Sequence, residues 1–80
     1  MRYIDYYRSR CKKEKILVDP HFITWIIKVE SYVYNRTGLY LLDLPDESYM
    51  SLYETKVNPI SVAKMIVENF EESNRVLFSY

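Results

Sequence analysis

The sequence predicts an all-α fold: a compact single domain, residues 1–80, of about four helices packed around the second one, with an extended C-terminal tail. Three observations support this fold class. Apolar residues recur at spacings of three and four along most of the chain, which is the period of a helix with one buried face. Asp19-Pro20 and Asn58-Pro59 each combine a capping residue with a first-turn proline, as helix starts do. A chain of 80 residues, 49% of them hydrophobic, suits one domain with a single core.

The first helix is expected at about residues 2–15. Ile4, Tyr7 and Cys11 lie at helical spacings there, so they form an apolar stripe with basic residues on its flanks. The segment ends before Asp19, which is a good N-cap for the helix that follows.

The second helix, at about 20–37, is expected to be central. At 100° per residue, one narrow stripe holds its polar residues Thr24, Lys28, Ser31 and Asn35. The apolar arc that remains covers roughly 220°, which is wider than a surface helix needs, so we expect packing on several sides. Gly38 follows at the position of a left-handed C-terminal cap. An alternative interpretation pairs residues 32–34 and 39–42 as a β-hairpin, because aromatic and branched residues favour strands. The helical period favours the helix.

The third and fourth helices are expected at about 45–55 and 59–72. Pro45 lies between carboxylates, which indicates a helix start after an apolar connector. The fourth helix has an apolar face made of Ile60, Ala63, Ile66, Val67 and Phe70. The tail, residues 75–80, is largely apolar, and we expect it to pack as an extended segment on the domain or on a second copy of the chain.

The formal net charge is zero, but the basic residues are concentrated near the N-terminus. Residues 1–15 carry six basic groups and two acidic ones, while the rest of the chain is acidic in balance. The basic segment therefore attracts an anionic partner or docks onto the acidic remainder of the same chain. We favour the intramolecular interpretation, since the chain as a whole has no excess charge.

No pattern typical of catalysis or cofactor binding occurs. A Cys11–His21 nucleophile and base would also need an oxyanion site, and the chain lacks a glycine-rich turn to build one. We therefore expect no enzyme activity, no cofactor and no small-molecule substrate. Helical geometry puts Glu30 opposite His21, and the acidic residues lack the pattern of a calcium loop, so no metal site is expected.

The sequence also predicts a cytoplasmic protein with no membrane partner. Met1 leads directly into polar and aromatic residues without an apolar leader, and the longest apolar stretch is too short to span a bilayer. The single cysteine, Cys11, excludes an internal disulfide, which fits a reducing compartment.

Glu30 lies within the apolar arc of the second helix. A buried carboxylate must be paired or hydrogen-bonded. We favour a bond to a tyrosine hydroxyl or to an arginine of the first segment. The alternative is that this part of the helix contacts a partner.

Nine of the 80 residues are tyrosine, whose apolar ring and polar hydroxyl suit partly solvated binding surfaces. Four of them fall on inward-facing stripes and are assigned to the core: Tyr7, Tyr34, Tyr49 and Tyr53. The candidate partner-binding residues combine the other tyrosines with nearby charges and the tail: Tyr3, Tyr6, Arg8, Arg10, Lys12, Lys13, Glu30, Tyr32, Tyr40, Phe78 and Tyr80.

These features predict a small non-enzymatic protein-binding module. It would self-associate as a homo-oligomer, or inhibit or adapt a larger complex, and an inhibitor encoded by a phage or another mobile element would have this composition. The alternative is a nucleic-acid-binding accessory protein whose basic, tyrosine-containing first helix clamps phosphates and stacks on bases.

Overall fold

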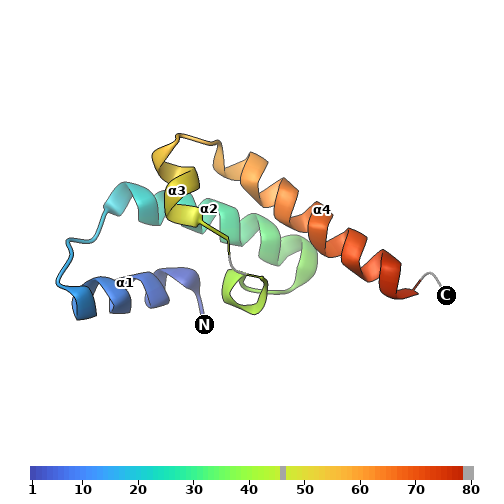
Figure 1. The fold of residues 1–80 in the computed structure, drawn as a ribbon, viewed down its shortest axis with the longest axis horizontal. Helices are drawn as coiled ribbons and strands as arrows, with labels where there is room; N and C mark the ends of the chain where they lie inside the picture. Colours follow the sequence, from blue (N-terminus) through green and yellow to red (C-terminus); the bar gives the residue numbers. More distant parts are fainter. Residues whose placement is uncertain (46, 79–80) are drawn as a thin grey trace.

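Over the residues that the structure describes, the chain folds as four α-helices and one short 3₁₀ turn. The computed structural model describes residues 1–45 and 47–78, with residues 74–78 described as backbone only. In chain order the elements are α1 (Tyr3–Glu14), α2 (Pro20–Thr37), the 3₁₀ turn η1 (Leu41–Asp43), α3 (Tyr49–Glu54) and α4 (Pro59–Phe78) (Figure 1). The predicted all-α class is confirmed. The hairpin alternative is wrong, because α2 runs unbroken to Thr37 and the described residues contain no strand.

The second helix is the centre of the molecule, as predicted. α4 packs along α2, α1 lies beside α2 elsewhere on its surface, and α3 also contacts it (Figure 1). The core is built mainly from buried apolar residues of α2 and α4: Phe22, Ile26, Val29, Val33, Val62, Ala63, Ile66 and Val67. Because the wide apolar arc of α2 is shared among three neighbouring helices, no single helix has to cover it.

Both predicted caps of α2 are present. The Asp19 carboxylate accepts hydrogen bonds from the backbone N–H groups of His21 at 2.9 Å and Phe22 at 3.3 Å, which satisfies donors that have no partner inside the helix. At the other end, Gly38 adopts a left-handed conformation with φ 72°, and its N–H donates to the Tyr34 carbonyl at 2.8 Å. These two caps fix both ends of the central helix.

The third helix begins later than predicted, at Tyr49 rather than Pro45. Two local effects explain the difference. The Asp43 carboxylate accepts a hydrogen bond from the Tyr40 backbone N–H at 3.2 Å and closes η1 as a separate turn. Leu44 is extended, with φ −110° and ψ 164°, because the proline that follows disfavours helical backbone in the residue before it. The chain therefore passes from η1 to α3 through a non-helical connector.

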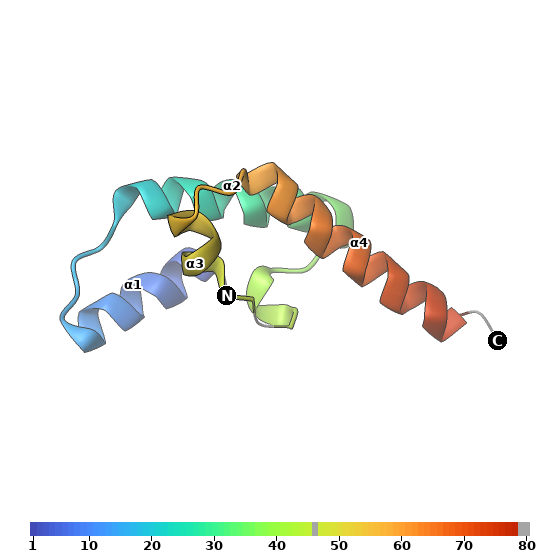
Figure 2. The ribbon, with the colours of Figure 1, turned by 45° about the horizontal axis from the view of Figure 1, so that its top comes forward.

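The fourth helix is longer than predicted and reaches Phe78, so the segment expected to be extended from residue 75 is helical up to that point. No glycine or proline interrupts residues 60–78, and helix propagation costs little once a helix is nucleated. The last turns of α4 extend beyond the end of α2 (Figures 1 and 2), and the molecule measures 49 × 23 × 19 Å. Ser79 and Tyr80 lie outside the described residues.

Candidate binding surfaces

Glu30 is buried, with 6% of its surface exposed, and its carboxylate caps two other elements. The backbone N–H of Tyr3 donates to its two oxygens at 3.2 and 3.1 Å, and the backbone N–H of Leu41 donates to Oε2 at 3.1 Å. Tyr3 and Leu41 are the first residues of α1 and η1, and the N-cap residue of α1, Arg2, makes no side-chain cap. One carboxylate of α2 therefore supplies the acceptor and the negative charge that two helix N-termini favour.

The prediction that Glu30 is hydrogen-bonded within the chain is confirmed, but the predicted donors were wrong. The carboxylate is hydrogen-bonded within the chain, but its donors are backbone N–H groups rather than a tyrosine hydroxyl or an arginine. The alternative, in which Glu30 contacts a partner, does not agree with its burial.

The basic residues of α1 remain in solvent. Arg8, Lys12 and Lys13 are exposed, and within the described parts of the chain no ion pair joins a basic residue of 1–15 to an acidic residue beyond it. Arg10 pairs with Glu14 of the same helix at 3.3 Å and donates to the Tyr6 hydroxyl at 2.8 Å. The expected docking of the basic segment onto the acidic remainder therefore gains no support from the ion pairs of the described residues and stays a prediction.

A groove of about 330 Å³ runs along α1. It brings together three predicted site residues, Tyr3, Tyr6 and Arg10, with Tyr7 and Phe22 among the other lining residues. The aromatic rings of the groove pack against one another. The ring centroids of Tyr3 and Tyr6 lie 5.4 Å apart in an edge-to-face arrangement, and those of Tyr7 and Phe22 lie 4.8 Å apart. The groove is therefore an apolar surface with ordered walls.

The other predicted tyrosines lie on separate surfaces. Tyr40 stacks on Tyr34 at 4.8 Å, and the Tyr32 ring lies 4.2 Å below the Arg36 guanidinium. Tyr34 was assigned to the core but is 44% exposed, because the face of α2 that it shares with Ile27 is not covered by a neighbouring helix. Phe78 ends α4 and is described as backbone only, so its predicted role lies outside the described side chains, as does that of Tyr80.

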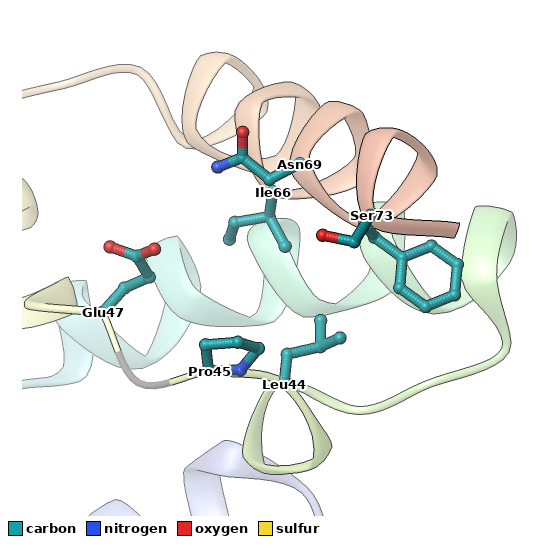
Figure 3. Close-up of a pocket in the computed structure, with 7 residues that line it drawn as sticks. Leu44, Pro45, Glu47, Ile66, Asn69 and Ser73 are labelled. Carbon is teal, nitrogen blue, oxygen red and sulfur yellow. The ribbon is translucent and has the colours of Figure 1, made fainter. Parts of the chain in front are cut away.

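A second apolar groove lies between α4 and the connector that follows η1 (Figure 3). Its volume is about 300 Å³. Ile66 of α4 points toward Leu44 and Pro45 across the groove (Figure 3). Phe70 is a further apolar residue that lines it. Glu47, Asn69 and Ser73 form a polar rim. We call this the α4 groove.

Sequence reasoning missed the α4 groove because it assigned Pro45 to the start of a helix. It also missed the loop between α1 and α2, where Ile16, Leu17 and Val18 are exposed. Three consecutive apolar residues between a helix end and the Asp19-Pro20 helix start are a signal that could have revealed this loop.

Cys11 and His21 lie in different environments. Cys11 is buried, while His21 is exposed in the first turn of α2. Partial burial raises the pKa of Tyr7. A hydrogen bond from the Asp19 backbone N–H lowers this pKa, and a hydrogen bond with the Cys11 thiol raises it.

Among the described residues no three histidine, cysteine or acidic side chains lie close enough together to hold a metal ion. None of the described helices has the length and apolar character needed to cross a bilayer.

Comparison with known proteins adds no relationship: no protein-family model, no curated protein and no solved structure matches the chain.

Proposed function

We propose that the protein is a small non-enzymatic protein-binding module, and that the α4 groove receives an apolar side chain of the partner. The observation that carries this proposal is an apolar floor inside a polar rim (Figure 3). Protein interfaces have the same arrangement, because the apolar centre is desolvated while the rim keeps its hydrogen bonds.

The size of the α4 groove supports a partner side chain as its occupant. About 300 Å³ is at the lower limit for small-molecule pockets, but it accommodates one large anchoring residue of the kind that dominates interface energies. Ile66 is 6% exposed and Phe70 is half-buried, so the floor is already ordered before a partner binds. The partner is a second copy of the chain or a larger protein.

The α4 groove can be blocked without disturbing the core. Ser73→Arg places a long side chain on the rim, where Ser73 is exposed. Ser61→Arg makes the same chemical change at another exposed position of α4 that does not line the groove, so it is the matched control.

The test has two measurements. Sedimentation at several concentrations detects self-association, and capture from nuclease-treated lysate of the source cells detects other protein partners. Association or capture should be lost in Ser73→Arg and kept in Ser61→Arg. Equal behaviour of the two variants would contradict a role for the α4 groove.

Nucleic-acid binding through α1 is the second candidate, and the exposed cations Arg8, Lys12 and Lys13 favour it. The aromatic part of that hypothesis has weaker support. Tyr3 and Tyr6 are half-buried and held edge-on against each other, whereas stacking on bases needs open ring faces. A salt titration with mixed DNA and RNA is the test, and absence of binding at low salt would remove this candidate.

A further inference from the structure

The loop between α1 and α2 carries the most exposed apolar segment of the described side chains. Ile16, Leu17 and Val18 are 57%, 92% and 42% exposed. Apart from Met1, no other large apolar side chain among those described exceeds 44%. The loop lies at the end of the molecule opposite the C-terminal turns of α4 (Figure 1). We call residues 16–18 the loop tip.

Both ends of the loop tip are held in place. The Ile16 N–H donates to the Cys11 carbonyl at 2.9 Å, after a left-handed Lys15 with φ 56° ends α1. The Asp19 N–H donates to the Tyr7 hydroxyl at 2.9 Å, and the Asp19 carboxylate accepts from Tyr53 at 3.0 Å. The fold therefore presents the apolar side chains outward on a defined backbone.

Exposed lysines lie on the N-terminal side of the loop tip. Lys12, Lys13 and Lys15 are exposed in the residues just before it. The two acidic residues nearby in the sequence already have partners: Glu14 pairs with Arg10, and the Asp19 carboxylate caps α2. The lysines therefore have no anionic partner within the described chain.

We propose that the loop tip inserts into the surface of a membrane that contains anionic lipids, with the lysines next to it contacting lipid phosphates. Apolar side chains that reach the acyl boundary and cations that remain at the headgroups are the two requirements of interfacial binding.

The shape of the loop tip favours a lipid surface over a protein partner. A stable protein interface buries about 800 Å² on each side with complementary shape, which three residues on a convex loop do not provide alone. A fluid lipid surface needs no matching pocket. The expectation of no membrane partner considered only spanning segments, and interfacial binding needs none.

The first test is co-sedimentation of the whole chain with vesicles. We expect binding to phosphatidylcholine vesicles that contain roughly 30% phosphatidylglycerol, little binding to phosphatidylcholine alone, and release by salt. Leu17→Asp should weaken binding at least about tenfold. The fold should survive this change, since Leu17 is 92% exposed. Met65→Asp, at a 41% exposed apolar position of α4, is the matched control and should bind as the wild type does.

The second test places a reporter in the loop tip. Leu17→Trp adds an exposed indole, whereas the natural Trp25 is buried. Its emission should shift to the blue on anionic vesicles and be quenched by brominated lipid. Failure to bind anionic vesicles at low salt, wild-type binding by Leu17→Asp, or an indole that stays in water would each overturn the proposal. Preference for an oligonucleotide over vesicles would also overturn it and assign the lysines to nucleic acid.

Discussion

At the residue scale, Glu30 shows what a single buried charge does in this fold. Its position in an apolar arc predicted that it must be hydrogen-bonded. Its donors, Tyr3 and Leu41, lie 27 and 11 residues away in sequence. They could not be predicted because they meet Glu30 only after α1 and η1 pack on α2. The residue joins three elements and is structural rather than part of a contact surface.

Glu30→Ala should lower the free energy of unfolding by about 2 kcal/mol or more, because it removes the carboxylate that accepts hydrogen bonds from the backbone N–H groups of Tyr3 and Leu41. Glu30→Gln keeps one carbonyl oxygen and should cost less. Glu68→Ala, at an exposed position of α4, is the control and should change stability by less than about 0.5 kcal/mol. Urea unfolding measures all three. Unchanged stability of Glu30→Ala with loss of partner binding would instead make Glu30 a contact residue.

Asp19 gives the fold a pH dependence. Partial burial acts to raise the pKa of Asp19, but hydrogen bonds from the Tyr53 hydroxyl and from the backbone of Phe22 and His21 outweigh it, so the pKa lies below its usual value of 3.8. A carboxyl whose pKa is lower in the folded state stabilises the fold above the unfolded pKa. That contribution is lost as the pH falls through the folded pKa.

Tyr53→Phe removes one of these hydrogen bonds and should reduce stability at neutral pH. The difference from the wild type should shrink as the pH falls below about 4, because Asp19 is then increasingly protonated in both proteins. Tyr34→Phe, at an exposed position, is the control and should match the wild type throughout. Urea unfolding at neutral and acid pH decides this, and a difference that does not vary with pH would contradict the role given to Asp19.

At the element scale, the sequence predicted best where capping chemistry is local. Asp19-Pro20 and Gly38 correctly predicted where α2 begins and ends, because both signals act through neighbouring backbone groups. Pro45 misled the prediction of α3, because proline both begins helices and holds the preceding residue extended, and here the second effect prevailed. Which part of the wide apolar arc of α2 stays exposed depends on where α1 and α4 dock. The helical spacing of apolar residues in the sequence does not show which part of the arc the neighbouring helices cover.

Two adjacent isoleucines of α2 test this arrangement. Ile26 is fully buried and Ile27 is 39% exposed. Ile26→Ala should cost about 2 to 5 kcal/mol, a large part of the total of about 4 to 12 expected for 80 residues. Ile27→Ala should cost less than about 1 kcal/mol, because it leaves no cavity and alanine favours helix. Thermal and urea unfolding provide the comparison, and equal losses would mean that α2 is rotated relative to this structure.

At the scale of the whole molecule, the loop between α1 and α2 lies apart from the C-terminal half of α4 along the elongated body (Figure 1). The loop carries the loop tip, and residues 66–73 of α4 line the α4 groove. Neither surface was predicted, because each depends on a non-helical segment: the connector at Leu44-Pro45 and the loop after α1. Basic residues lie next to the loop tip, while the α4 groove has an apolar floor with a polar rim. A module with two such surfaces can bind a protein partner through the α4 groove while the loop tip binds an anionic lipid surface.

The most direct test of protein binding is site-specific photocrosslinking along α4. A photoreactive amino acid is placed at Asn69, on the rim of the α4 groove, and separately at Lys64, an exposed position of α4 that does not line it. After irradiation in source cells, position 69 should give a discrete adduct with a second copy of the chain or with a larger protein, and position 64 should give none. No adduct from position 69, or equal adducts from both positions, would contradict the proposal.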